Sequence, residues 1–435
     1  MQQRPGVRRI TVFVEHFPPY LGSDRSVFEL GRRAADRGIS IQFIATQPLR
    51  YLLGGRPPDW EYKKRWSQPP PKVHPNITAH YLITGKNIES VWKRNRYLAL
   101  LLTILLFTAY SIRPIIRHSS DLVVAAHATP LLGVVAMLAA KLTRRRLLMG
   151  CPDWMSAYAA GLLGTSLHSL GPRLLHILEV RLYKWSDRVF TVTHFLRRLL
   201  IHAGVSPDKI AVIPNGVDPK MFSPEVDTSA VKRKYRLEDL RVILFSGHLE
   251  EWAGLSLIYD LARRLDKEYP DSRILLVGSG ESIVELFDRL VRRNLGHMLI
   301  HAGLHPYEAM PVFTAAADIA LCIFPDTPVA HAASPLKIFE YMAAGTAVVA
   351  TAVAGTLEAL SEGGGILVPP NDSEALCDAV IRLCRDDRLR EDLSRKAREV
   401  VEQRYSWDQL AERFLEECDR CVGLHTASTT QRSAT

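Results

Sequence analysis

Short apolar runs alternate with amphipathic stretches along most of the chain. The run RITVFVEHF at 9–17 predicts a strand, and the stretch at 25–38 repeats apolar residues every three to four positions, as an amphipathic helix does, before ending at Gly38. The run ISIQFIAT at 39–46 predicts a second strand. The opening is therefore a β-α-β unit with a glycine-bearing loop at the carboxyl end of its first strand, where open α/β sheets bind ligands.

The same alternation continues in two blocks that a proline-rich break separates. Further strands are predicted at 121–127, 145–154, 187–193, 241–248, 272–280, 298–303, 318–325, 347–351 and 365–370. The break, IPNGVDPKMFSPE at 213–225, excludes regular structure, so each block predicts its own doubly wound α/β sheet. We expect an N-terminal domain at 1–216, a C-terminal domain at 217–404, a helix at 405–421 that crosses back to the first domain, and a disordered tail at 422–435.

Composition narrows the class of protein. The chain has 435 residues, of which 47% are apolar and 23% charged, and this balance excludes long disorder and collagen-like architecture. The net charge of +9 favours polyanionic partners, namely nucleic acid, anionic lipid or phosphorylated small molecules. Because no nucleic-acid-binding motif is present, we expect no nucleic acid partner. Six cysteines in a chain of this size and the absence of a signal peptide predict a cytoplasmic protein.

One segment complicates this picture of a soluble protein. The stretch YLALLLTILLFTAYSI at 97–112 has no charge and is flanked by lysine and arginine on both sides. It is shorter than the roughly 20 apolar residues of a spanning helix, so we expect either a buried core helix, which we favour, or a helix in the membrane interface. The preceding stretch at 54–75 mixes tryptophan with lysine, which fits either an anionic membrane surface or a solvated proline-rich loop. Interfacial contact would make the protein peripheral at the inner face of the membrane.

The most informative stretch is SPLKIFEYMAAGTAVVAT at 334–351. Pro335 can occupy the first turn of a helix, which places Lys337 and Glu340 near the helix start. There Lys337 could bind a phosphate, and Glu340 could accept hydrogen bonds from sugar hydroxyls. A plain Lys–Glu pair on a solvated helix explains the same spacing equally well. Glycines that follow strands, such as Gly247 and Gly278, could approach phosphates, although each is as readily a turn.

These motifs, taken in order, resemble the retaining glycosyltransferases of family 4, the glycosyl transferases group 1. The matching stretches are PPYLGSDRSVFELGRRAADRG, IAVIPNGVDPKMFSP, ILLVGSGE, SPLKIFEYMAAGTAVVAT, AGTLEAL and GILVPPND. The resemblance implies the GT-B fold, with two Rossmann-like domains facing a central cleft, the first binding the acceptor and the second the nucleotide sugar. It also implies retaining transfer of a hexose from a nucleotide diphosphate sugar to a glycan or lipid-linked acceptor, with no metal or other cofactor.

The resemblance also implies roles for single residues. Glu340 matches the glutamate that binds the ribose, and Gly22 matches the loop beside the donor phosphates. The expected donor-binding residues are Gly22, Arg25, Gly247, His248, Gly278, Lys337, Ile338, Glu340 and Glu358. Two family cations are missing, because His248 and Ala253 occupy their places, and the first family glutamate falls at Ala332. We expect Lys337, aided by Arg25, to bind the diphosphate instead.

Acceptor contacts are expected in the first domain. Asp153, a candidate catalytic residue together with Lys337, follows a predicted strand and could contact the acceptor or the donor sugar, or it could only start the next helix. His127 ends another strand and could touch the acceptor, or it could be a structural hydrogen bonder. The missing cations leave two further functions open: a GT-B scaffold subunit that no longer transfers sugar, and a nucleotide-sugar epimerase.

Overall fold

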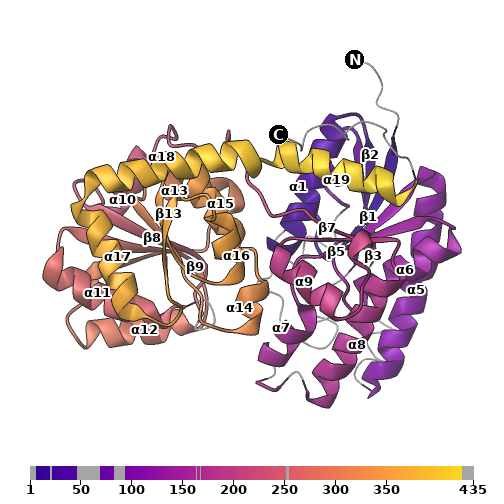
Figure 1. The fold of residues 1–435 in the computed structure, drawn as a ribbon, viewed down its shortest axis with the longest axis horizontal. Coiled ribbons are helices and arrows are strands. Elements are labelled where there is room, and N and C mark those ends of the chain that lie inside the picture. Colours follow the sequence, from indigo (N-terminus) through magenta and orange to yellow (C-terminus); the bar gives the residue numbers. More distant parts are fainter. Residues whose placement is uncertain are drawn as a thin grey trace, which may run out of the picture. The chain divides into compact units, whose positions relative to one another are not determined.

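The computed structural model describes residues 6–19, 22–46, 69–82, 94–162, 164–166, 168–250 and 254–423 (Figure 1). The chain divides into two compact units, Met1–Ile213 with Leu410–Thr435, and Pro214–Gln409. Most of the tryptophan-bearing stretch at 54–75, residue Ala253, and the tail from 424 onward lie outside the described residues.

Unit 1 is built on a parallel sheet of seven strands in the order β3-β2-β1-β4-β5-β6-β7. The strands are β1 Arg9–Val14, β2 Ser40–Thr46, β3 Ile77–Leu82, β4 Leu122–Ala125, β5 Arg146–Cys151, β6 Arg188–Thr191 and β7 Ile210–Val212. The central strands are apolar on both faces because helices cover both. Sequence pattern alone missed two strands: β3, an edge strand with alternating burial, and β7, which has only three residues.

The helices of unit 1 are α1 Gly22–Asp36, α5 Arg96–His118, α6 Leu132–Leu142, α7 Met155–Leu162, α8 Leu170–Trp185, α9 His194–His202, the 3-10 turn η1 Pro207–Lys209 and α19 Trp407–Cys421. Right-handed crossovers put α1 on one face of the sheet and α5, α6, α8 and α9 on the other. The C-terminal helix α19 returns to unit 1, where Phe414 packs edge-to-face on Phe190 and Asp419 accepts a hydrogen bond from the Val7 amide at 2.8 Å.

The apolar stretch at 97–112 forms most of α5, as predicted, but the preference for a buried core helix is wrong. Among the described residues, α5 from Tyr97 to His118 is the helix long and apolar enough to cross a membrane, with a mean hydropathy of 1.9. Only 33% of its apolar window is buried, and Tyr97 and Leu101 are exposed. Side chains on the other side of α5 pack on α6, β1 and β2, so the helix has one buried and one exposed face.

Unit 2 is built on a parallel sheet of six strands in the order β10-β9-β8-β11-β12-β13. The strands are β8 Arg241–His248, β9 Ser272–Ser279, β10 Leu299–Gly303, β11 Ile319–Cys322, β12 Ala347–Thr351 and β13 Gly365–Val368. Alternate residues of β8 enter the two cores: Ile243 and Phe245 pack in one, and Val242 and Leu244 in the other. The prediction of two doubly wound α/β sheets is confirmed.

The helices of unit 2 are α10 Ser229–Tyr235, α11 Ser256–Glu268, α12 Ser282–Val291, α13 Met310–Ala315, α14 Pro328–Ala332, α15 Leu336–Ala343, α16 Ala354–Ala359, α17 Ser373–Arg385 and α18 Asp387–Arg404, with 3-10 turns η3 Gly296–Met298 and η4 Tyr307–Ala309. Helices α11, α12 and α17 contribute to one core, and α13, α15 and α18 to the other. Arg398 of α18 fixes the end of α15, because its guanidinium donates to the carbonyl oxygens of Ala343, Phe222 and Pro219.

Candidate functional site

Helix α15 begins directly after Pro335 and lies against the carboxyl end of β8. The Lys337 ammonium donates to the carbonyl oxygen of Ser246 at 3.2 Å. It also lies 4.2 Å from the ring centroid of Phe245 and 5.1 Å from that of Phe324. Glu340, one turn further on, is only 6% exposed. A solvated Lys–Glu pair therefore does not explain this stretch, because the helix is buried from Ile338 to Ala343.

The surroundings of Lys337 shift the pKa of its ammonium group. Burial lowers the pKa of the Lys337 ammonium, while Cys322 and Glu340 oppose that shift. An ammonium has three donor hydrogens, and the Ser246 carbonyl takes one of them. A partly desolvated cation with spare donors attracts an anionic oxygen more strongly than a solvated one, because water screens it less. Lys337 can therefore hold a phosphate oxygen at the end of β8.

Tyr341, also on α15, hydrogen-bonds to the same end of β8. Its hydroxyl accepts a hydrogen bond from the Ser246 amide at 3.0 Å and lies 2.8 Å from the Ser246 hydroxyl oxygen. The Tyr341 ring is fully buried, and burial raises the pKa of its phenol far above the usual range. Ser246 is thus held at its amide, its hydroxyl and its carbonyl by two residues of one helix. The sequence pattern identified neither Ser246 nor the role of Tyr341.

The glycines at the ends of β8 and β9 have different structural roles. Gly247 pairs with Gly278 in register, and both have positive φ, 116° and 146°. A Cβ on Gly278 would lie 1.8 Å from the carbonyl oxygen of Gly247. His248, which follows, is exposed. Close packing therefore requires a glycine at 278, whereas a Cβ at 247 would meet no atom within 4 Å and the glycine there is favoured by its positive φ alone.

The loop before α15 is held by residues from two other segments. Asn215, from the IPNGVD stretch, donates through its side-chain amide to the Ser334 carbonyl at 2.6 Å. Gly355 of α16 lies so close that a Cβ there would come within 1.9 Å of the Ala333 carbonyl oxygen. Ala332, where the resemblance implies a glutamate in relatives, is 1% exposed. Asn215 therefore positions the loop before α15, a role that the sequence analysis did not identify.

The remaining predicted donor residues differ in their surroundings. Ile338 is fully buried, and its side chain packs in the hydrophobic core of unit 2. Glu358 is half-buried on α16. In unit 1, Gly22 is the first residue of α1 rather than a loop residue. Arg25 lies 3.7 Å from Glu29 on the same helix and donates to the Pro19 carbonyl at 3.4 Å.

A cluster of acidic and histidine side chains lies at the carboxyl ends of β1 and β4 in unit 1. The buried Asp24 carboxylate accepts a hydrogen bond from the His16 amide at 2.9 Å and lies 2.7 Å from His16 Nδ1. His127 Nε2 lies 4.0 Å from carboxylate oxygens of both Asp24 and Glu15. His127 thus joins an electrostatic network that the sequence analysis did not identify, although an aspartate at a helix start after a strand was the available signal.

Asp153 lies between β5 and α7 and is half-buried. Burial, and secondarily the Glu179 carboxylate, raises the pKa of Asp153 to about 7. Glu179 of α8 accepts hydrogen bonds from the Met155 and Ser156 amides at 3.0 and 3.1 Å, so Glu179 caps the start of α7. Burial raises the pKa of Glu179 to about 7 as well. An apolar pocket of about 170 Å³ lies beside this pair, between α8 and α9, with Trp154 in its lining.

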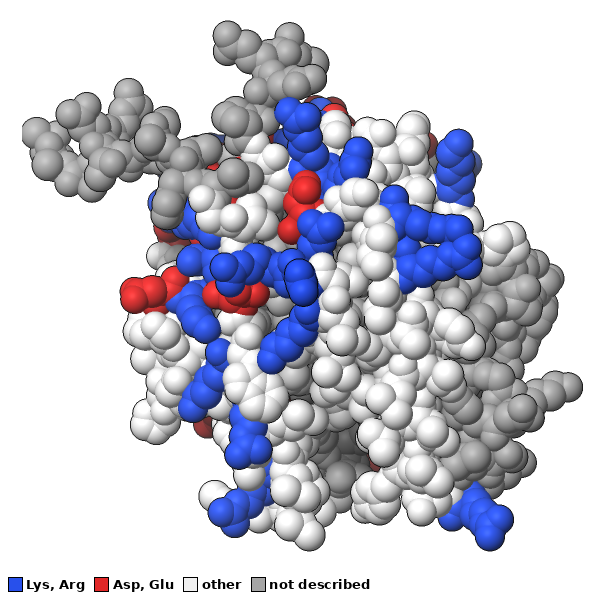
Figure 2. Space-filling view, turned by 90° about the vertical axis from the view of Figure 1, so that its right-hand side faces the viewer, with Lys and Arg blue, Asp and Glu red and all other residues white. Residues whose placement is uncertain are grey.

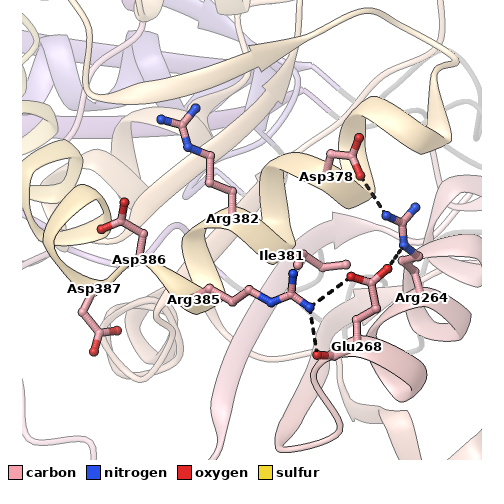
Figure 3. A pocket seen from close by; sticks show the side chains of 8 residues that line it. All are labelled: Arg264, Glu268, Asp378, Ile381, Arg382, Arg385, Asp386 and Asp387. Atoms are coloured by element: carbon pink, nitrogen blue, oxygen red, sulfur yellow. Dashed lines mark hydrogen bonds and ion pairs between the residues drawn. The ribbon is translucent and has the colours of Figure 1, made fainter.

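A wider hollow of about 620 Å³ lies elsewhere in unit 2 (Figure 3). It is lined by residues of the carboxyl-terminal parts of α11 and α17 and by the start of α18. Its charges pair with one another: Arg264 lies 2.9 Å from Asp378, and Arg385 lies 3.1 Å from Glu268. Figure 3 shows Arg382 pointing away from this network. The hollow is an ion-paired junction of two helices and contributes nothing to the site at β8.

Within the described residues, no group of three or more histidine, cysteine, aspartate or glutamate side chains could hold a metal ion. The candidate functional residues instead fall into two sets, one per unit. Both sets lie at the carboxyl ends of parallel strands, where open α/β sheets bind ligands. The set in unit 2 combines a cation, a buried carboxylate and a helix start, which suits a phosphorylated ligand with hydroxyl groups.

Comparisons with known proteins identify a family that matches most of the chain. The family profile described as Glycosyltransferase Family 4 matches residues 21–221, and that described as Glycosyl transferases group 1 matches residues 227–400. An uncharacterized glycosyltransferase of Methanocaldococcus jannaschii is 27% identical over 56% of this chain and 63% of its own length. N-acetyl-alpha-D-glucosaminyl L-malate synthase of Bacillus anthracis is 23% identical over 93% of this chain and 96% of its own length.

Among solved structures, Anabaena HepE in complex with UDP and glucose superposes with a TM-score of 0.68, covering 94% of this chain and 98% of its own, at 18% identity. The two parallel α/β sheets and this superposition assign the GT-B fold to the chain. The chain belongs to the group 1, or family 4, glycosyltransferases, because the two profiles together match nearly all of residues 21–400. The resemblance inferred from the motifs is confirmed.

Proposed function

We propose that this glycosyltransferase moves a hexose from a nucleotide diphosphate sugar to a glycan or lipid-linked acceptor, with retention at the anomeric carbon and without a metal ion. The single observation that supports the donor half is the placement of Lys337 and the buried Glu340 at the start of α15, with the Lys337 ammonium bonded to the Ser246 carbonyl at the carboxyl end of β8. In this proposal Lys337 binds a diphosphate oxygen, and Glu340 accepts hydrogen bonds from ribose hydroxyls.

The reaction requires that the leaving diphosphate be stabilised. As the bond between the anomeric carbon and the diphosphate oxygen breaks, negative charge grows on the diphosphate, and the fixed Lys337 ammonium lowers the barrier by stabilising it. The sugar becomes oxocarbenium-like. The acceptor hydroxyl oxygen then bonds to the same face of the anomeric carbon, and its proton passes to the departing diphosphate oxygen. No protein base is required for that proton.

The acceptor half is proposed for unit 1. Asp153 has a pKa of about 7, so near neutral pH it can exchange between donating and accepting hydrogen bonds to a sugar hydroxyl. His127 offers a second polar contact beside Asp24. Because the HepE structure contains UDP and glucose, UDP-glucose is the first donor to test. We further propose a cytoplasmic enzyme that acts peripherally at the inner face of the membrane.

A second candidate function is a binding or scaffold subunit that does not transfer sugar. It is favoured by one observation: the positions of the family's paired glutamate and first diphosphate arginine hold Ala332, which is buried, and His248. Both functions predict donor binding through Glu340, and only the transferase predicts hydrolysis or transfer.

The deciding experiment is calorimetric titration with UDP-, GDP-, ADP- and dTDP-sugars, followed by detection of slow hydrolysis. We expect one donor to bind and to be hydrolysed, and Glu340→Gln to weaken its binding by about tenfold or more, because a charged hydrogen bond contributes roughly 1.5–3 kcal/mol. Glu285→Gln, which changes an exposed carboxylate of α12, is the matched control and should behave as the native chain. Binding without turnover would favour the scaffold, and no binding to any donor would contradict both functions.

A further inference from the structure

Helix α5 has its polarity reversed relative to a helix on a water-facing surface. Its buried stripe, with residues four apart, consists of Ala99, Thr103, Phe107, Ser111 and Ile115. Its exposed large side chains up to the last turns are Tyr97, Leu98, Leu101, Leu105, Leu106 and Tyr110. In water, a surface helix places its apolar residues toward the core and its polar residues outward. The outer side of α5 therefore suits an apolar medium.

Two hydroxyls on the buried stripe of α5 find their hydrogen-bond acceptors within the helix itself. Thr103 donates to the Ala99 carbonyl at 2.7 Å, and Ser111 donates to the Phe107 carbonyl, so both are satisfied within the helix. Small side chains there let α5 pack closely on β1, β2 and α6. Because the sheet side of α5 is covered by protein, the helix can enter lipid with only one side and cannot be surrounded by it.

Neighbouring helices extend this apolar surface. Helix α6 packs against α5 and also against α8, and α7 packs against α8. Exposed apolar side chains on these helices are Leu142 of α6, Tyr158 of α7, and Leu170, Leu174, Ile177 and Trp185 of α8. Lys141 at the end of α6 lies 5.6 Å from the centroid of the Trp185 ring, which joins the two helices at the surface. Tyrosine and tryptophan are enriched where protein meets a membrane interface.

The charge on these helices has one sign. Helices α5 to α8 carry exposed cations at Arg113, Arg117, Lys141, Arg173, Arg181 and Lys184. Their single carboxylate is Glu179, which is buried and occupied in capping α7. Among the described residues, none of these six cations forms an ion pair. Figure 2, which views the molecule from the side of α5 and α6, shows white surface edged by blue side chains, with very little red in its lower half.

We propose that these exposed apolar and basic residues of α5, α6, α7 and α8, here termed the apolar-basic face, dock on an anionic lipid bilayer. The Leu and Tyr side chains of α5 enter the interface, and the cations lie against the headgroups. A protein partner would be expected to meet a face that carries both signs of charge, whereas a face with cations alone complements anionic lipid. This surface gives a physical basis to the peripheral location proposed above. Because its test requires no sugar transfer, the membrane proposal and the glycosyltransferase proposal can each fail alone.

The test is sedimentation of the full chain with vesicles of phosphatidylcholine alone or with about 30% phosphatidylglycerol. We expect binding to the anionic vesicles that salt weakens, and little binding to the neutral ones. Leu101→Ser/Leu105→Ser should reduce anionic binding by about tenfold or more, because it removes two apolar side chains from the interface. Val284→Ser/Val291→Ser, which changes two similarly exposed residues of α12 in unit 2, is the matched control and should bind as the native chain.

Both double variants change exposed side chains, so their thermal transitions should match that of the native chain, and this is measured first. Native binding by Leu101→Ser/Leu105→Ser would overturn the proposal, as would the absence of native binding to anionic vesicles. Light scattering that shows a native dimer, dissociated by the same double variant while vesicle binding is absent, would instead assign the face to a second copy of the chain. Equal binding to neutral and anionic vesicles would overturn the role of the cations.

Discussion

Tyr341→Phe removes one hydroxyl from the core of unit 2 and tests whether α15 fixes the end of β8. The change leaves the ring in place, so no cavity larger than an oxygen atom forms. The Ser246 amide loses its acceptor, and the Ser246 hydroxyl loses its partner. Because Ser246 is 3% exposed, water cannot readily replace either bond.

The expected cost follows from those two bonds. A buried donor left without a partner costs roughly 1–3 kcal/mol, so we expect a loss of about 2 kcal/mol. For a unit of the size of Pro214–Gln409, that corresponds to a fall of about 4–8 °C in the thermal transition of unit 2. The assay is scanning calorimetry together with donor titration. Donor affinity should fall as well, because the Ser246 carbonyl that positions Lys337 belongs to the same loosened residue.

Tyr259→Phe is the control, because the Tyr259 ring packs against Arg289 and its hydroxyl makes no hydrogen bond to the described residues. It should shift the transition by about 1 °C or less. A double-mutant cycle with Ser246→Ala should show a coupling of about 1 kcal/mol between the two hydroxyls. If Tyr341→Phe unfolded within 1 °C of the native chain, or if the two changes were additive, the hydrogen bonds at β8 would not stabilise the site as argued.

Three further predictions concern packing and charge. Gly278→Ala should lower both the transition and donor affinity, because its Cβ would lie 1.8 Å from a carbonyl oxygen, whereas Gly161→Ala, at an open position in α7, should stabilise by about 1 kcal/mol. Arg398→Met should cost about 2 kcal/mol by leaving carbonyl acceptors unpaired, which urea unfolding would measure, and an unchanged midpoint would contradict it. Burial raises the pKa of Glu179 to about 7, so the folded state holds a proton that the unfolded state releases, and stability should fall as pH rises from about 5 through 7. Calorimetry across this pH range should show a smaller loss of stability for Glu179→Gln than for the native chain. Part of the loss should remain, because burial raises the pKa of Asp153 to about 7 as well. An unchanged dependence of stability on pH in Glu179→Gln would refute the raised pKa of Glu179.

Most of the fold could be predicted from the sequence because both sheets consist of buried parallel strands, whose apolar runs stand out between amphipathic helices. The exceptions have physical causes. The edge strand β3 has polar residues at exposed positions and follows a proline-rich stretch, and β7 has three residues beside the break at 213–225. The burial of helix α5 was predicted wrongly because hydropathy depends only on composition, whereas the direction in which each face of a helix points depends on tertiary packing.

The candidate site was less predictable than the fold. The spacing of Lys337 and Glu340 indicated the helix start, and the structure supplies what spacing cannot: burial of the carboxylate and the contact with Ser246. His16 and Asp24 were missed because their pairing depends on a loop that folds back onto a helix start. The sequence signals only an aspartate at a helix start after a strand, and it does not indicate that His16 is the partner of that aspartate.

Helix α8 connects the two proposals made for unit 1. Its buried side carries Glu179, which caps the start of α7 at Met155, two residues after the candidate acceptor contact Asp153. Its outer side carries exposed Leu174, Ile177 and Arg181 of the apolar-basic face. Residues on opposite sides of one helix lie within about 10–12 Å, the diameter of a helix with its side chains. An acceptor whose lipid part remains in the bilayer could therefore present its sugar or phosphate near Asp153 without leaving the membrane, which is the physical reason to test lipid-linked acceptors before soluble glycans.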